Sequence, residues 1–286
     1  SLPRLTWLAY AGNPFCETDG RYDAASVKAA TSELKAIAST ELDQGEILGQ
    51  GASGVIYKGQ WRQIESGSDT EASGSAPDKD VAIKIFKGEM TSDGSPLDEM
   101  QACIAAGGHP NLVNVLGRYD AEDQDGLVLS FIPPEYRNLG GPPSLDSCTR
   151  DTYSDDTTFT LPVILRITRG IASAVAHIHA QGIMHGDVYA HNILVNDEGH
   201  CIFGDFGAAS FYNRSGEAVA SGLEKMESRA FGCLLEDLLD RYLPEDRAES
   251  EQDSIRHLRQ LQQNCMNPDP MLRPLFPAIC KTLATL

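Results

Sequence analysis

Hydrophobic and polar positions alternate with a period of two along much of the first half of the chain, from Glu46 onward. The stretch EILGQGASGVIYKGQW predicts two strands joined by a glycine turn. The apolar runs VAIKIF, LVNVLGRY and GLVLSFI predict further strands, and LDEMQACIAAGG predicts a short helix that ends at glycine. We therefore expect a β-rich unit here.

Beyond Thr160, which suits a helix N-cap, the apolar spacing becomes helical. One stripe comprises Ile164, Ile167, Ile171, Val175 and Ile178; a second comprises Phe231, Leu234, Leu235, Leu238 and Leu239. The stretch NILVNDEGHCIF predicts a hairpin that turns from Asn196 to Gly199, and a last helix is expected after Pro277. Strands followed by helices indicate a two-lobed α+β fold.

The N-terminal residues follow a different pattern. Leu2, Leu5 and Leu8, followed by Asn13 and Pro14, resemble the last turn of a leucine-rich repeat, with an ordinary strand as the alternative. One repeat cannot bury its own face, so residues 1–16 are interpreted as the remnant of a longer repeat region that could bind a partner. In residues 17–41, a helical linker is expected: the apolar positions Val27, Ala30, Leu34 and Ile37 predict a packing helix over 24–38.

Composition excludes several classes of function. The 286 residues carry a formal net charge of −18, which disfavours nucleic-acid and anionic membrane partners. We found no apolar run near the length of a membrane span, so none is predicted. The seven cysteines form no CxxC pair, which disfavours zinc and fits a reducing, cytoplasmic location. Two polar stretches, IESGSDTEASGSAPDKD and PPSLDSCTRDTYSDDTTFT, predict loops.

Chemistry first appears in the strand-rich half. Gly49, Gly51 and Gly54 lie between two strands, where glycine lets the backbone approach a polyphosphate; a dinucleotide fold would need a helix next. Lys84 ends an apolar strand and needs an acidic partner, for which Glu99 on the next helix is the natural choice and Asp98 the fallback. A surface lysine that keeps its charge in water is the alternative.

The stretch MHGDVYAHNILV, and GDFG after it, carry the groups that phosphoryl transfer needs. Asp187 can orient an acceptor hydroxyl and accept its proton. Asn192 and Asp205 can offer oxygen ligands to Mg²⁺. Each motif alone has an ordinary structural explanation.

The order of the motifs is specific. Glycine loop, VAIK, helix acid, HxDxxxxN and DFG together resemble the eukaryotic-type protein kinase family over about Leu42 to Leu286. The resemblance implies an N-lobe at 42–132, a C-lobe at 133–286, and binding of ATP and Mg²⁺. It also implies Leu129 as gatekeeper, Ser130 to Ile132 as adenine-binding hinge, and Val55, Ala82 and Leu194 around adenine. A stacked regulatory spine would comprise Cys103, Val115, His185 and Phe206.

Departures from that family are informative. Gly186 replaces the arginine that usually receives an activation-loop phosphate, and Tyr189 replaces the usual lysine. His191 stands where tyrosine kinases place an arginine, so we expect a charged His191 to assist the moving phosphate; its packing elsewhere is the alternative.

The family's APE motif does not follow GDFG. Glu227 matches its next anchor and Arg273 its late arginine, and Glu224 is a substitute for the missing glutamate. The segment after Gly207 is short, so we expect activity without loop phosphorylation, although exposed hydroxyls at Ser210, Tyr212, Ser215 and Ser221 are expected to accept phosphate. The helix that often docks protein substrates is expected to be reduced.

The function predicted is therefore a protein kinase, resembling kinases linked to leucine-rich repeats, with a protein hydroxyl of Ser, Thr or Tyr as acceptor. A small-molecule kinase of the aminoglycoside or choline kinase type is an alternative, because those enzymes also carry HGD followed by Asn. An ATP-binding pseudokinase scaffold is the third reading.

Overall fold

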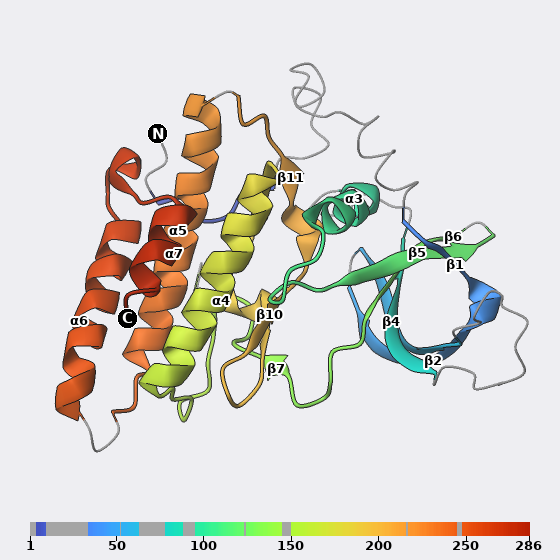
Figure 1. The fold of residues 1–286 in the computed structure, drawn as a ribbon, viewed down its shortest axis with the longest axis horizontal. Coiled ribbons are helices and arrows are strands. Elements are labelled where there is room, and N and C mark those ends of the chain that lie inside the picture. Colours follow the sequence, from blue (N-terminus) through green and yellow to red (C-terminus); the bar gives the residue numbers. More distant parts are fainter. Residues whose placement is uncertain are drawn as a thin grey trace, which may run out of the picture.

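The computed structural model describes residues 4–9, 34–51, 53–62, 78–87, 95–122, 124–144, 150–215, 217–244 and 248–286. These residues form a strand-rich lobe and a helical lobe that lie side by side (Figure 1). The predicted α+β, two-lobed fold is therefore confirmed.

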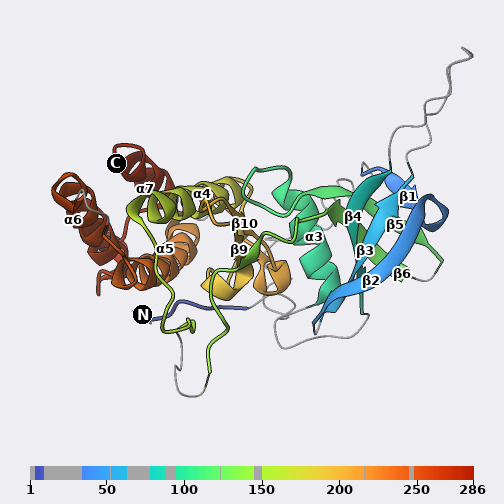
Figure 2. The same cartoon turned by 90° about the horizontal axis from the view of Figure 1, so that it is seen from below.

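A six-stranded sheet forms the first lobe, in the order β1-β5-β6-β4-β3-β2 (Figure 2). Its strands are β1 Ala36–Ala38, β2 Leu42–Gln50, β3 Gly54–Trp61, β4 Lys79–Phe86, β5 Val115–Ala121 and β6 Gln124–Ser130. The β1–β5 pair is parallel and the other pairs are antiparallel.

Successive side chains of β4 and β6 pack on opposite faces of this sheet, as the period of two requires. Ile83 and Val128 join the cluster on one face, and Ala82 and Leu127 the cluster on the other. Helix α3 (Pro96–Ala106) covers the second face through residues of that same cluster. Ser95 caps its first turn, accepting a hydrogen bond from the Leu97 amide at 3.2 Å, and the helix ends at Gly107, as predicted.

The helical lobe is built around α4 (Leu161–Ala180). Its other helices are α5 Glu217–Asp240, α6 Ala248–Cys265 and α7 Phe276–Leu283, and its short strands are β7 Arg137–Asn138, β8 Ile183–Met184, β9 Ile193–Val195, β10 Cys201–Phe203 and β11 Ser210–Phe211. Every residue of the first predicted stripe is fully buried in the lobe core: Ile164, Ile167, Ile171, Val175 and Ile178.

Helix α6 was not anticipated, because its sequence is mostly polar; Leu258 and Leu261 are its buried anchors. Only residues 241–247 separate α5 from α6, and the described ones, 241–244, contain no helix. The stretch between α5 and CMNPDP, in which the substrate-docking helix was expected to be reduced, thus contains the 18-residue α6.

One expectation needs correction. The helix predicted over 24–38 is wrong at its end: Ala36–Ala38 is β1, because Ile37 is fully buried where β1 pairs with β5. The rest of that helix, most of the repeat remnant and most of the first polar loop lie outside the described residues. Among the described helices, α4 is long and apolar enough to meet a membrane-span test by length and composition. Arg166 and Arg169 interrupt its apolar run, and many of its residues are buried in the core of the helical lobe, so this helix alone does not show a membrane span.

Candidate active site

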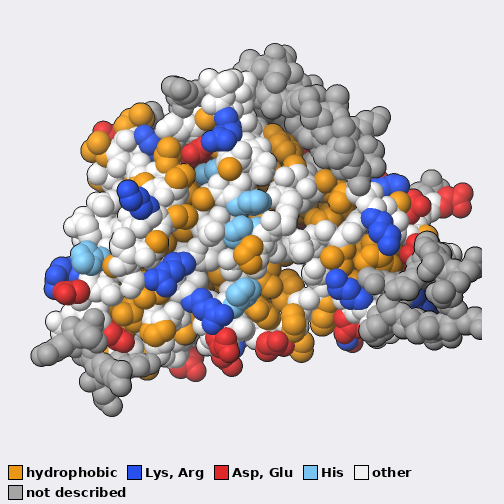
Figure 3. All heavy atoms as spheres, in the orientation of Figure 1, with side chains coloured by type: hydrophobic (Ala, Val, Ile, Leu, Met, Phe, Trp, Pro, Cys, Tyr) orange, Lys and Arg blue, Asp and Glu red, His pale blue; other side chains and the backbone are white. Residues whose placement is uncertain are grey.

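A cavity of about 520 Å³ lies between the two lobes, and most of the predicted site residues line it. From the sheet, α3 and the segment just after β6 come Gly49, Ala82, Lys84, Glu99, Leu129, Ser130 and Ile132; from the helical lobe come His191, Asn192, Leu194 and Asp205. On the face shown in Figure 3, hydrophobic side chains gather between the lobes. The fold thus brings together, in one cavity, predicted site residues that are far apart in the sequence.

Lys84 and Glu99 form an ion pair at the back of this cavity. The Glu99 side chain is 1% exposed and that of Lys84 12%. Burial lowers the pKa of Lys84, but Glu99, Cys103 and Asp205 outweigh it, so that the pKa lies above its ordinary value. Lys84 is therefore a fixed positive charge directed into the cavity, as the sequence predicted.

The three glycines of the predicted loop have different roles. Gly49 lines the cavity, and an added Cβ at Gly49 or Gly51 would meet nothing within 4 Å. At Gly54, an added Cβ would stand 2.4 Å from the Ile85 carbonyl oxygen, so glycine is needed for packing on β4. Close packing thus adds a second requirement for glycine at this position.

One predicted adenine contact is displaced by one position. Ile56 is one of the described residues that line the cavity, whereas Val55, predicted for this role, is not among them. Neighbouring residues of a strand point to opposite faces, so only one of the two can face the cavity. Ala82 and Leu194, predicted for the same role, do line it.

Asp187 and Asn192 face each other across the catalytic loop. The Asn192 side-chain amide donates to Asp187 Oδ2 at 2.8 Å and to the Asp187 carbonyl oxygen at 3.1 Å. Burial raises the pKa of Asp187, but His191, His185 and Asn192 outweigh it and bring the pKa below its ordinary value. Asp187 is therefore ionised at neutral pH, the form that can accept a hydrogen bond from an acceptor hydroxyl.

His191 lies between two carboxylates, one of which the sequence analysis missed. Its Nδ1 is 2.7 Å from Asp151 Oδ1, and its Nε2 is 3.5 Å from Asp187 Oδ2. Asp151 is held in turn by the Ala190 amide, which donates to its Oδ2 at 2.5 Å. Burial lowers the pKa of His191, but the two carboxylates raise it to about 9, so the ring is charged at neutral pH.

Asp151 lies in the second predicted polar loop, which has no periodicity that would single it out. Its burial, 9% exposed, and its two hydrogen bonds emerge only from the fold. The sequence analysis expected a charged His191, and in the structure two protein carboxylates, Asp151 and Asp187, stabilise that charge.

Asn192 and Asp205 suit a divalent cation. Because the Asn192 nitrogen donates to Asp187, its amide oxygen is the atom left to act as a ligand. Asp205 is exposed to solvent in the cavity and is the only described non-glycine residue with positive φ, at 58°. Backbone strain of this kind clusters at functional sites.

Tyr189, the unusual residue of the loop, is not among the described residues that line the cavity. Its side chain is 8% exposed, and its hydroxyl is 2.8 Å from the hydroxyl of Thr6. Gly186 has φ +82°, and a Cβ there would stand 2.4 Å from the Ala208 carbonyl oxygen. The family's arginine therefore cannot occupy this position without a change in the backbone.

Glu227 on α5 holds the catalytic loop through the backbone of Gly186. It accepts hydrogen bonds from the Gly186 amide at 2.7 Å and from His179 at 2.5 Å, and it is 1% exposed. Glu224 accepts from the Tyr212 hydroxyl at 2.7 Å. Arg273 donates to the carbonyl oxygens of Asn267 and Lys225.

Three of the four predicted spine residues, Cys103, Val115 and Phe206, line the cavity, and the fourth, His185, lies beside Phe206. Cys103 packs against the clusters of both lobes, one of which includes Val115 and the other Phe206. The His185 ring lies 4.9 Å from that of Phe206 and donates to the Gly204 carbonyl at 3.0 Å. This column links α3, which carries Glu99, to the catalytic loop.

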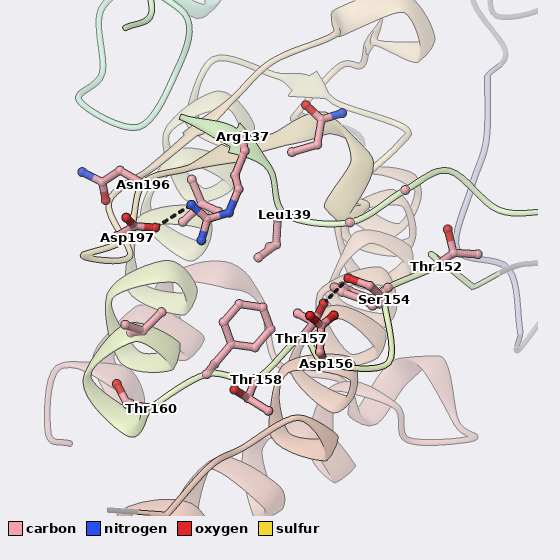
Figure 4. Close-up of a pocket in the computed structure, with 17 residues that line it drawn as sticks. Arg137, Leu139, Thr152, Ser154, Asp156, Thr157, Thr158, Thr160, Asn196 and Asp197 are labelled. Atoms are coloured by element: carbon pink, nitrogen blue, oxygen red, sulfur yellow. Dashed lines mark hydrogen bonds and ion pairs between the residues drawn. The ribbon is translucent and has the colours of Figure 1, made fainter. Parts of the chain in front are cut away.

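A second cavity, of about 690 Å³, lies in the helical lobe (Figure 4). Hydroxyl side chains of Thr152, Ser154, Thr157, Thr158 and Thr160 line it, and ion pairing of Arg137 with Asp197 closes one side. It is larger than the cavity between the lobes, but it contains none of the predicted catalytic residues. We therefore assign the active site to the cavity between the lobes.

Comparison with known proteins agrees with this geometry. The protein tyrosine and serine/threonine kinase family matches residues 42–231. The L-type lectin-domain containing receptor kinase V.7 of Arabidopsis thaliana is 29% identical over 194 residues, 66% of this chain and 25% of the relative. A probable serine/threonine-protein kinase of Dictyostelium discoideum is 25% identical over 282 residues, 86% of this chain and 28% of the relative.

Mitogen-activated protein kinase kinase kinase 3 of Arabidopsis thaliana is 30% identical over 169 residues, 58% of this chain and 23% of the relative. The chain spans less than a third of the length of each of these three relatives. With the family match covering more than half of the chain and the ordered motifs meeting in one cavity, the chain belongs to the protein tyrosine and serine/threonine kinase family.

Proposed function

We propose that the chain transfers the γ-phosphoryl group of ATP to a serine or threonine hydroxyl of a protein. The observation that carries the proposal is the meeting of the Lys84–Glu99 pair with His191, Asn192 and Asp205 in one cavity. The choice of serine or threonine rests on the Dictyostelium discoideum relative, whose name describes a probable serine/threonine-protein kinase.

In this mechanism the adenine lies between Ala82 and Leu194, and backbone groups of Ser130 to Ile132 hydrogen-bond its edge. Lys84 binds phosphate oxygens, and its pairing with Glu99 keeps its long side chain in one position. Asn192 and Asp205 would hold Mg²⁺, which when bound neutralises charge on the phosphates.

Asp187 orients the acceptor hydroxyl and accepts its proton. Since Asn192 and His191 both contact Oδ2, the other carboxylate oxygen is the one that faces an acceptor. The charged His191 is held by Asp151 and contributes positive potential beside the transferred group, the role that the family usually gives to lysine or arginine.

The test is transfer of label from radioactive ATP to casein, a basic protein or a panel of small alcohols. Label in protein phosphoserine and phosphothreonine is expected. Label in small alcohols alone would indicate a small-molecule kinase, and no label would indicate a scaffold.

Lys84→Met should abolish transfer, because no other charge replaces the phosphate contact. Lys79→Met is the matched control: it lies on the same strand, is exposed, and should retain activity. Circular dichroism should show that both variants remain folded. A fully active Lys84→Met protein would contradict the assignment.

The link to leucine-rich repeats is part of the proposal and is supported by the pattern of residues 1–16 alone. Of these, residues 4–9 are described, and they pack on the helical lobe rather than on a neighbouring repeat. Any partner that such repeats would bind is outside the chain.

A further inference from the structure

The segment from Arg4 to Ala9 runs without helix or strand across the catalytic loop (Figure 2, dark blue). It is attached at two points. The Leu8 amide donates to the Gly186 carbonyl oxygen at 3.2 Å, and the hydroxyls of Thr6 and Tyr189 lie 2.8 Å apart. These two loop residues flank Asp187 in the sequence, so the segment is attached on both sides of the proposed base.

Its leucines pack on an apolar surface of the helical lobe, here named the groove. Leu5 and Leu8 pack against a buried cluster drawn from β8, the residue after β11 and the first half of α5: Met184, Tyr212, Ala220 and Met226, with Leu223 beside them. Trp7 points outward and is 41% exposed. Backbone bonding combined with pockets for selected side chains is how proteins recognise extended peptides.

The shape of the loop suits such an occupant. An added Cβ at Gly186 would stand 2.8 Å from the Leu8 carbonyl oxygen, so only glycine leaves room for the segment. The exchange of lysine for tyrosine also acquires a role, because a neutral hydroxyl at this position bonds the hydroxyl of the occupant. Both departures from the family therefore lie under the segment.

We propose that this groove is an interaction surface for an extended polypeptide of the pattern Leu-Thr-x-Leu, and that residues 4–9 fill it as an intramolecular competitor. The proposal rests on the proposed kinase function, because an acceptor segment must pass along the same face of the loop to reach Asp187. The partner is then the acceptor region of the protein substrate, with a serine or threonine that bonds Tyr189. Displacement of residues 4–9 opens the groove.

The test uses the full chain with Leu5→Asp and Leu8→Asp together, which should detach the segment because two charges cannot enter the apolar groove. Trp7→Ala is the matched control, since that side chain is exposed. The probes are the labelled hexapeptide RLTWLA and its variant RDTWDA, with binding measured by fluorescence anisotropy in the absence of ATP. A tethered competitor acts at a high effective concentration, so the detached variant should bind RLTWLA about tenfold or more tightly than the parent.

RDTWDA should not bind, and the Trp7→Ala chain should bind like the parent. Adding Tyr189→Phe to the detached variant should weaken binding of RLTWLA by about two- to tenfold, the effect of one neutral hydrogen bond. Equal binding of RLTWLA by parent and detached variant, or equal binding of the two peptides, would overturn the proposal.

Activity toward a basic protein separates the two hypotheses. Activity without selective peptide binding leaves the kinase function in place and rejects the groove. Selective peptide binding without any transfer by parent or variant leaves the groove and rejects the function. Loss of transfer in a detached variant that still melts cooperatively would overturn the competitor role, because the segment would then support the catalytic loop.

A second measurement needs no substitution. In the intact chain the Leu8 amide should be protected from hydrogen exchange, and millimolar RLTWLA should accelerate its exchange while RDTWDA should not. A Leu8 amide that exchanges equally fast in both cases would overturn the proposal even where the double variant failed to fold.

Discussion

At the scale of single residues, the unusual positions of the catalytic loop have local physical causes. Gly186 adopts a φ that other residues rarely adopt, and its neighbours leave no space for a side chain. His191 is charged because two carboxylates face its two ring nitrogens. Each cause leads to a variant whose effect can be measured.

Gly186→Ala should lower the free energy of unfolding by about 1–2 kcal/mol from the backbone alone, and further through contact with the Ala208 carbonyl. Gly222→Ala is the control: Gly222 is exposed in α5 with open space around it, and alanine there should stabilise by roughly 0.5–1 kcal/mol. Urea unfolding of both variants gives the comparison. Equal stability of the parent and Gly186→Ala would show that the loop relaxes without cost.

His191→Ala should reduce turnover by roughly 10- to 100-fold, the effect of one charge-assisted hydrogen bond. His191→Arg should retain much of the activity because it restores the charge. The exposed His257 of α6 provides a control, and its replacement by alanine should leave turnover as in the parent. The turnover of each variant is measured by steady-state kinetics with saturating ATP. A turnover of His191→Ala equal to that of the parent would mean that the His191 ring contributes only packing.

At the scale of elements, the segment between GDFG and α5 is short, and residues 208–212 are packed against the helical lobe. Only residues 208–216 separate Gly207 from α5. Ser210 and Tyr212, expected from the sequence to be exposed, are 2% and 5% exposed, because β11 pairs with β8 and the Tyr212 hydroxyl bonds Glu224. Ser215, by contrast, is exposed.

Phosphatase treatment should therefore change the kinase rate by no more than about twofold, because Gly186 offers no cation to a loop phosphate. The measurement compares treated and untreated protein by initial rate, with mass spectrometry to confirm removal of phosphate. Replacement of Ser215 and Ser221 by alanine should likewise have little effect. A rate that collapses on treatment would show that another cation receives the phosphate.

At the scale of the whole molecule, His185 couples the core to pH. Burial lowers its pKa below the ordinary value, against an opposing effect of Glu227, Asp187 and Asp205. The folded protein thus favours the neutral ring, whereas the unfolded chain protonates it near pH 6.5. Its contribution to stability is present above that pH and is lost as the pH falls below it, at up to about 1.4 kcal/mol per pH unit.

His185→Phe keeps a ring against Phe203 but cannot protonate, so its free energy of unfolding should depend less on pH than that of the parent. Urea titrations between about pH 7.5 and 5.5 measure this slope. His257→Gln serves as control and should keep the parental slope. Parallel slopes for His185→Phe and the parent would assign the pH dependence to other groups.

By itself, the sequence determined the kind of most main elements and indicated most of the residues that line the cavity between the lobes, since periodicity and residue chemistry are local properties. The buried stripe of α4, the strands around Lys84 and the loop of Asp187 all follow from such patterns. The tertiary structure alone decided which distant residues meet. Asp151 reaches His191 across 40 positions, and Thr6 reaches Tyr189 across 183. Ile37 lies in a strand because β1 pairs with β5 and this pairing buries its side chain. Such contacts depend on chain closure over long distances, which local spacing does not encode.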